Sequence, residues 1–301
     1  MKRILNALLL AGGCLAATGV QAKLNIFACE PEWGALAKEL AGDKAEIDIA
    51  TTALQNIHQI EPKPSLIAKL RRADLLLCTG AELESGWLPQ LTRQSGNAKI
   101  VSGNGNFMAA SFITTLDKPA QIDRAAGDVH PQGNPHFHLD PYRMGVIADA
   151  LATRLELLDA ANAPVYRKNL ADFNARWTAA TKAWETKAKP LAGRKIIVHH
   201  KSWAYLNNWL GLVQVATLEP KPGVPPTSSY LVSVVTTAET EKPMAIVLAG
   251  YQDPKAANWL SKRSSLPIVT LPFSVGGDPM SKDLFSMYDS TINKLLAAAA
   301  K

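Results

Sequence analysis

The sequence predicts an α/β protein of two lobes, each with a parallel sheet flanked by helices, joined by one long rigid helix. Short aliphatic runs alternate with amphipathic patterns in residues 24–116 and again after residue 195, which is typical of parallel strand-helix-strand units. Between them, residues 164–189 have one helical pattern that begins at Pro164 and is stopped by Pro190. The 301 residues also exceed what one hydrophobic core usually serves. We expect a first lobe over residues 23–163, a connecting helix over 164–190 and a second lobe over 191–301.

Hydrophobic spacing, together with residues that begin or end helices, predicts the elements of the first lobe. Gly42 ends the first amphipathic stretch, and Pro64 stands at a helix start, where its missing N–H costs no hydrogen bond. The expected strands are residues 24–28, 45–50 and 74–79, and the expected helices are residues 32–40 and a segment that begins with 64–70.

The middle of the chain is predicted to be helical, because residues 143–158 and 164–189 carry apolar side chains at helical spacing. A helix of roughly 24 residues is about 36 Å long, enough to run along two stacked lobes. Trp177 and Trp184 are seven residues apart on this helix. They therefore share one side of it, and we expect them to pack against a lobe.

The second lobe repeats the alternation of strands and helices. Its expected strands are residues 195–199, 245–249 and 268–271, and its expected helices are residues 202–210, 255–262 and 284–300. Ligand clefts in parallel sheets lie beyond the carboxyl ends of the strands. The loops that follow the predicted strands are therefore the places to look for binding residues.

The N-terminus is typical of a secretory signal peptide over residues 1–22. Two basic residues precede an apolar run, and small residues lead to Ala22, after which we expect cleavage. The apolar run is too short for a membrane span, so the mature protein is expected to be soluble in the periplasm. An alternative is a lipoprotein signal that ends at Cys14, although the aliphatic residue usual before such a cysteine is missing.

The charge of the chain argues against nucleic acid as a partner. The basic residues number 32 and the acidic residues 26, and the leader accounts for two of the basic ones. This mild excess is spread along the chain, whereas nucleic-acid binders concentrate basic charge on one face. We expect a monomer.

Cys29 and Cys78 remain after the leader is removed, and each follows a short apolar run, so that each is expected at the end of a strand. Export permits a disulfide between them. The two sulfurs could meet if the two strands are neighbours in the sheet, but the spacing leaves this open.

All six histidines fall in three loops that follow predicted strands. The first loop contains His58. The second contains three histidines within nine residues, His130, His136 and His138, and the third contains the adjacent pair His199 and His200. Each one alone could be an ordinary surface or capping histidine. Together they predict a metal site, since neutral imidazole is a common ligand of zinc, which takes four donors at about 2.0–2.3 Å.

One histidine from each loop would supply three ligands, two from the first lobe and one from the second, so that the metal bridges the cleft. His136 and His138 would point to opposite sides of an extended segment, so we expect one of them to be a ligand. His130 is either a ligand on a lid over the site or a residue that binds metal weakly. Asp140 and Glu61 are placed to orient ligating imidazoles through their second ring nitrogen.

These loops resemble the motifs of the metal-binding proteins of bacterial ABC importers for zinc and manganese, the cluster A-I solute-binding family. The first family motif, Asp-Pro-His-x-Tyr-Glu-Pro, is matched in its second half by residues 58–62. The second, Asp-Pro-His-x-Trp-Leu-Asp-Pro, is followed by residues 134–141, with His138 in the place of the aromatic residue. In the third, a histidine precedes a tyrosine by five residues, as His200 precedes Tyr205. The resemblance extends from about residue 24 to the C-terminus.

The resemblance implies His58, His136 and His200 as ligands, with His199 the weaker candidate. It also implies a fourth, carboxylate ligand after the last strand, where this chain has no acid. Asp278 is the nearest substitute, followed by Asp253 and Asp283, and water is the rival. Three nitrogen donors with at most one carboxylate suit zinc better than manganese, which favours oxygen.

We therefore expect a periplasmic solute-binding protein, not an enzyme, that captures Zn(II) and delivers it to a membrane ABC permease. A manganese-specific binder of the same family is the alternative. A zinc hydrolase is a second alternative, since three histidines and a water are also a catalytic pattern, but no general base stands out. An adhesin with the same fold is the third alternative.

Overall fold

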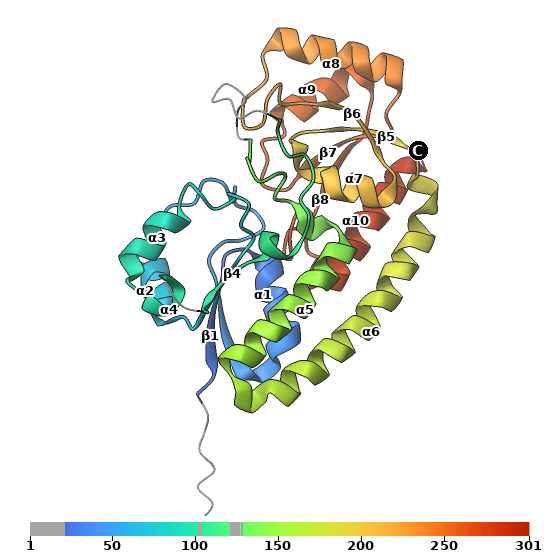
Figure 1. Cartoon of the computed structure of the whole chain (residues 1–301). Helices are drawn as coiled ribbons and strands as arrows, with labels where there is room; N and C mark the ends of the chain where they lie inside the picture. Colours follow the sequence, from blue (N-terminus) through green and yellow to red (C-terminus); the bar gives the residue numbers. More distant parts are fainter. Residues whose placement is uncertain (1–21, 102–103, 121–126, 128, 301) are drawn as a thin grey trace, which may run out of the picture.

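The computed structural model describes residues 22–101, 104–120, 127 and 129–300, and it has two lobes, each on a four-stranded parallel sheet (Figure 1). This confirms the predicted fold class. The predicted leader, apart from Ala22, lies outside the described residues, and so does Cys14. None of the helices in the described ranges has the length and apolar character needed to cross a membrane.

The sheet of the first lobe has the strand order β2-β1-β3-β4. Its strands are β1 (Leu24–Ala28), β2 (Ala45–Ile49), β3 (Leu75–Cys78) and β4 (Asn106–Met108). Alternate residues of a strand point to opposite faces. Ile26 of β1 thus belongs to the core shared with α1, and Phe27 to a separate core on the other face.

Helices cover both faces of this sheet. Helix α1 (Pro31–Ala41) lies on the face toward the second lobe, and the other face is covered by α2 (Pro64–Arg72) and α3 (Leu88–Ser95), with the short α4 (Ala98–Val101) near β3 and β4. Each of the first three helices has a proline in its first turn, as expected from the missing N–H of that residue.

Two long helices follow each other in the middle of the chain, and the second connects the lobes. Helix α5 (Pro141–Leu158) is capped by Asp140, whose side chain accepts hydrogen bonds from the first backbone N–H groups. Helix α6 (Ala163–Ala188) runs along both lobes (Figure 1). Trp177 and Trp184 are buried, with their ring N–H groups bonded to Pro141 O and Asp289 Oδ1, both at 2.8 Å. This confirms the predicted packing of the two tryptophans.

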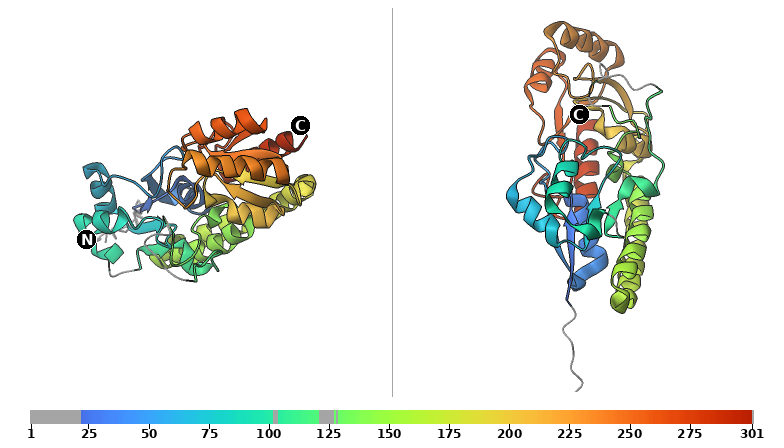
Figure 2. Two further views of the ribbon diagram at one scale, coloured as in Figure 1. Left: turned by 90° about the horizontal axis from the view of Figure 1, so that it is seen from above. Right: turned by 60° about the vertical axis from the view of Figure 1, so that its left-hand side comes forward.

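The sheet of the second lobe has the order β6-β5-β7-β8. Its strands are β5 (Lys195–Val198), β6 (Val213–Thr217), β7 (Ala245–Ala249) and β8 (Ile268–Leu271), and its helices are α7 (Ala204–Leu210), α8 (Ser228–Glu241), α9 (Lys255–Ser264) and α10 (Leu284–Ala299). Helices α8 and α9 pack on the face away from the first lobe and lie far from α2 and α3 (Figure 2). Short 3-10 turns cover Gly42–Lys44, Ala109–Phe112, Phe137–Leu139, Ala160–Asn162, Lys189–Leu191 and Lys201–Trp203.

Several elements were not predicted from the sequence, namely β4, β6, α3, α4 and α8. Strand β4 has three residues, too few for a periodic signal. Helix α8 is rich in valine and threonine, which have weak helix propensity. It is stabilised by Thr227, whose hydroxyl accepts a hydrogen bond from Tyr230 N, and by Leu231 and Val234, which pack on the second sheet.

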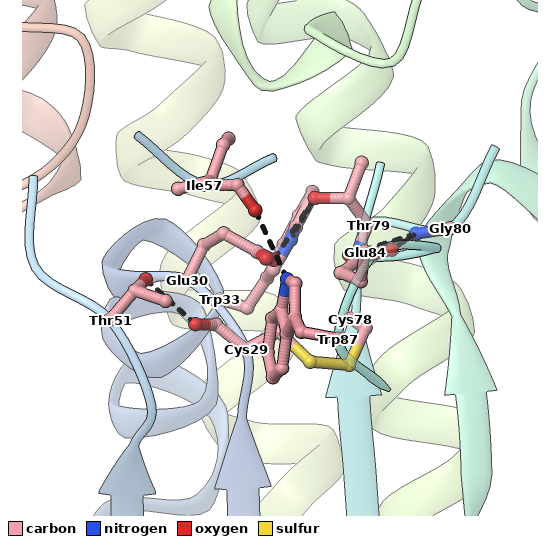
Figure 3. Close-up of a disulfide and its surroundings, with 10 residues drawn as sticks. All are labelled: Cys29, Glu30, Trp33, Thr51, Ile57, Cys78, Thr79, Gly80, Glu84 and Trp87. Atoms are coloured by element: carbon pink, nitrogen blue, oxygen red, sulfur yellow. Dashed lines mark hydrogen bonds between the residues drawn. A yellow bond between two sulfur atoms is a disulfide. The ribbon is translucent and has the colours of Figure 1, made fainter. Parts of the chain in front are cut away.

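A disulfide joins Cys29 and Cys78, which resolves the pairing that the sequence left open (Figure 3). Strands β1 and β3 are parallel neighbours, and Ala28 is paired with Leu77. The next residue of each strand is a cysteine, so the two Cα atoms lie 4.8 Å apart.

Candidate metal centre

His58 is carried by the loop after β2, and this loop is fixed to the start of α3. Trp87 donates its ring N–H to Ile57 O at 3.0 Å, and His58 N donates to Asn56 Oδ1. A Cβ on Gly86 would lie 2.9 Å from His58 O, so only glycine allows this close approach. The backbone at His58 is therefore held in place by its surroundings.

His136 lies directly before the 3-10 turn Phe137–Leu139 that leads into α5, and it is 1% exposed. Its backbone N–H donates to Asn134 Oδ1, and the Asn134 amide donates in turn to Lys201 O of the second lobe at 2.9 Å. Phe273, which follows β8, contacts the ring of His136 with the ring centroids 5.3 Å apart. Residues of both lobes therefore position this histidine.

His200 follows β5 in the second lobe and is almost buried. Its Nδ1 lies 2.6 Å from Glu219 Oε2. Because the carboxylate can only accept, the imidazole donates from Nδ1 and leaves Nε2 as the acceptor.

The structure brings together three of the four residues predicted as ligands. One ligand atom from each of His58, His136 and His200 lies within 4.8 Å of the other two. The ring centroids are 5.7 Å apart for His58 and His136, and 6.0 Å apart for each of the other two pairs. A tetrahedral zinc ion with Zn–N bonds of about 2.0–2.1 Å separates its ligand nitrogens by roughly 3.4 Å. The ligand atoms would therefore have to approach one another by at most about 1.4 Å to bind a zinc ion together.

The pKa of His136 is well below its usual range. Burial is the main cause, because it disfavours the charged imidazolium, and the neighbouring His58 and His200 lower the pKa further. The ring of His136 is therefore neutral at pH 7, which is the form that binds a metal ion.

His130 stacks on His58 with the ring centroids 5.2 Å apart. It also lines a cavity of about 370 Å³ with His136 and His200. His130 is not in the group of three converging ligand atoms, but it lies at the edge of that group.

His138 is not one of the three converging histidines. Its Nε2 is 2.8 Å from Phe273 O, and because a carbonyl only accepts, Nε2 is the donor. Its Nδ1 is 3.4 Å from Glu32 Oε1, and the residue is fully buried. The segment is not extended as the sequence argument assumed, because residues 137–139 form a 3-10 turn, and the rings of His136 and His138 both contact Phe273. The bond from His138 to Phe273 O joins the two lobes.

The prediction of Asp278 as a ligand is not supported by its position. Its carboxylate accepts from Lys294 Nζ and Ser290 Oγ, both at 2.7 Å, and from backbone N–H groups of its own turn. Burial raises the pKa of Asp278, but the bonds from Lys294 and Ser290 outweigh it and hold the pKa below the usual range. Within the described ranges, the converging group contains histidines alone. Phe273, an apolar residue, contacts His136 from the segment after β8.

The other acids considered from the sequence are also engaged elsewhere. Asp253 pairs with Lys255, and Asp283 caps α10. Asp140 caps α5 and pairs with Arg143, so it does not orient an imidazole, and Glu61 is exposed. The acid that does contact a predicted ligand is Glu219, which sequence reasoning missed because β6, the strand before it, was not recognised.

Two parallel α/β lobes joined by a long helix, with imidazoles converging between them, define the class of metal-binding solute-binding proteins of ABC importers called cluster A-I. The family model described as zinc-uptake complex component A, periplasmic (ZnuA), matches residues 26–298, and the chain belongs to this family.

Individual relatives are distant but cover most of the chain. The chain is 23% identical over 296 residues to the manganese ABC transporter substrate-binding lipoprotein PsaA of Streptococcus anginosus, covering 97% of this chain and 94% of PsaA. It is 24% identical over 254 residues to the iron ABC transporter substrate-binding lipoprotein MtsA of Streptococcus pyogenes serotype M1, covering 84% and 80%. A crystal structure of ZnuA shares the fold with a TM-score of 0.76 at 23% identity, over 90% of this chain and 98% of that one. The relatives are transport proteins rather than enzymes.

Proposed function

We propose that this protein captures Zn(II) between its lobes with His58, His136 and His200 and delivers the ion to a membrane ABC permease. The observation that carries the proposal is the convergence of three imidazoles, from both lobes, within 4.8 Å. The group contains nitrogen donors alone, which suit zinc better than manganese because manganese favours oxygen ligands. The names of the relatives include zinc, manganese and iron, so the choice of zinc rests on this donor set.

The fourth position on the ion is open to water or to His130, which stacks on His58 and lines the same cavity. X-ray absorption of the zinc-loaded protein counts the bound imidazoles. Four imidazoles, falling to three in His130→Ala, would assign the position to His130. Three imidazoles in both proteins would assign it to water.

We further propose that the chain works outside the cytoplasmic membrane as a monomer, after removal of residues 1–22. The basic and apolar leader supports export, and the relatives named above are lipoproteins, which keeps an anchor at Cys14 as the alternative. The two lobes are proposed to comprise residues 23–163 and 191–301, with 164–190 as the helix between them.

The experiment is a competition between zinc and manganese for the metal-free protein, followed by alanine substitution of each of the three histidines. We expect zinc to win, and each substitution to weaken zinc binding by more than about 100-fold, because a ligand is lost from a small set. Asp278→Asn is the matched control and should leave the affinity unchanged. If the alanine variants bound zinc as tightly as the wild type, the proposed site would be rejected. A preference for manganese would reject zinc as the transported ion.

A further inference from the structure

Glu219 lies at the carboxyl end of the second sheet, two residues after β6. Its backbone N–H donates to His199 O at 3.2 Å, and the preceding Leu218 N donates to Val198 O at 2.8 Å. These bonds continue the pairing of β5 with β6 beyond the strands. The backbone of Glu219 is thereby held beside the end of β5, where His200 begins its turn.

The carboxylate of Glu219 contacts both histidines at the end of β5. Oε2 accepts from His200 Nδ1 at 2.6 Å, and Oε1 lies 3.6 Å from His199 Nε2. A carboxylate oxygen only accepts hydrogen bonds, so the proton of the 2.6 Å contact lies on His200 Nδ1.

The same carboxylate also holds the loop that follows it. Oε2 accepts from Gly223 N at 2.8 Å, and the adjacent Pro222 lines the cavity that contains His130 and His136. Pro222 O in turn lies against Gly127 of the first lobe. A Cβ on Gly127, whose φ is +86°, would come within 2.4 Å of that oxygen. Glu219 thus connects His200 to a wall of the cavity and, through that wall, to the other lobe.

We propose that Glu219 is a positioning residue for the metal site: it selects the Nδ1–H tautomer of His200 and aims Nε2 at the ion. The proposal rests on the proposed function, because it acts through His200 as a ligand. A ligating imidazole needs its lone pair on the metal side, and a carboxylate on the opposite nitrogen fixes both the tautomer and the ring orientation. The link to Gly223 keeps the carboxylate in one place while the ion enters or leaves.

The test compares zinc affinity in Glu219→Ala and Glu219→Gln with the wild type. The alanine variant should bind zinc about 10- to 100-fold more weakly, the usual effect of losing such a partner. Glutamine keeps an acceptor oxygen but not the charge, so its loss should be smaller. Glu241→Gln is the matched control, since Glu241 is in the same lobe and pairs with Lys195 instead of with a histidine. The control should bind zinc like the wild type.

Nitrogen-15 NMR of the zinc-loaded proteins separates positioning from a general loss of structure. The wild type should show His200 with metal on Nε2 and a proton on Nδ1, and Glu219→Ala should lose this signature or show exchange between tautomers. Unchanged affinity in Glu219→Ala, an unchanged His200 signature there, or metal on Nδ1 in the wild type would each overturn the proposal. If Glu219→Ala does not fold, an unchanged affinity in Glu219→Gln overturns it.

Failure of the proposed function would look different. In that case His200→Ala itself would bind zinc as tightly as the wild type. If His200→Ala binds weakly and Glu219→Ala binds normally, the metal site stands and only the role of Glu219 falls.

Discussion

At the scale of single residues, the chemistry of the site depends on which imidazoles stay neutral. His136 is buried among other histidines, and its pKa is lowered first by burial and then by His58 and His200. A lowered pKa means that His136 meets proton competition only in more acidic solution. The ligand set as a whole still requires neutral imidazoles.

Zinc affinity should therefore fall as the pH drops below roughly 6 to 7, the range in which imidazoles begin to take up protons. Competition with a chelator of known pH dependence, from pH 5 to 8, measures this. An affinity that does not change over this range would contradict histidine ligation.

A second group of titratable residues is buried beside the disulfide (Figure 3). Glu84 accepts from Thr79 N at 2.7 Å, and Glu30 accepts from the Thr79 hydroxyl at 3.1 Å. Burial raises the pKa of Glu84 to about 7, and burial together with Glu84 and Glu32 raises the pKa of Glu30. Among the residues that the structure describes, none donates a hydrogen bond to the buried Glu30 Oε1, and a proton shared with Glu84 would supply one.

These raised pKa values predict that the metal-free protein loses stability as the pH rises through neutral. The contribution of Glu84 is complete below its ordinary pKa of 4.5 and is lost as the pH rises through about 7. The free energy of unfolding in urea should fall by on the order of 1–3 kcal/mol between pH 5 and 8 on this account. Glu84→Gln should remove most of that fall, and an identical pH profile in the variant would show that Glu84 is not responsible.

At the scale of elements, the ends of β1 and β3 support the loop that carries His58. The disulfide closes these ends together across a sequence separation of 49 residues. Trp87 packs in the same core as the two cysteines and donates to the backbone of that loop. The covalent link and the histidine loop are thus parts of one packed region.

Replacing Cys29 and Cys78 by alanine should lower the free energy of unfolding by up to about 4 kcal/mol, because the unfolded chain regains the freedom of a long loop. Urea unfolding of the variant and of the wild type, each with and without a reducing agent, measures this. The reductant should destabilise the wild type alone. Equal midpoints for variant and oxidised wild type would mean that the link adds nothing to stability.

At the scale of the whole molecule, the lobes share one packed core. The residues of α1, α5, α6 and α10 belong to the same hydrophobic cluster. Polar contacts cross the same interface: the Ser274 hydroxyl donates to Glu32, and the Tyr288 hydroxyl donates to His138 O at 2.7 Å. A wide hinge motion would break all of these contacts at once.

Zinc binding should therefore move loops and adjust the lobes slightly, without a large closure. Small-angle scattering of the protein with and without zinc should give the same radius of gyration within error. A clear decrease on adding zinc would show that the lobes rotate and that α6 is not a rigid connection.

The sequence by itself determined the two α/β lobes, the long helix and the positions of the three histidines that converge. Strand and helix periods and the loops after strands are local properties, so the three loops that carry the histidines could be found by position alone. The resemblance to a known family separated His136 from His138 and His200 from His199. In the structure, His136 lies with His58 and His200, whereas His138 bonds to Phe273 O.

The tertiary structure alone decided which distant partners these residues have. Asp278 is near the expected place along the chain, but its contacts with Lys294 and Ser290 depend on how α10 packs. The disulfide forms because β1 and β3 are neighbours in the sheet. The carboxylate of Glu219 reaches His200 because β6 pairs with β5. Hydrogen bonds and ion pairs act over a few ångströms in space, and spacing along a chain does not specify which segments come that close.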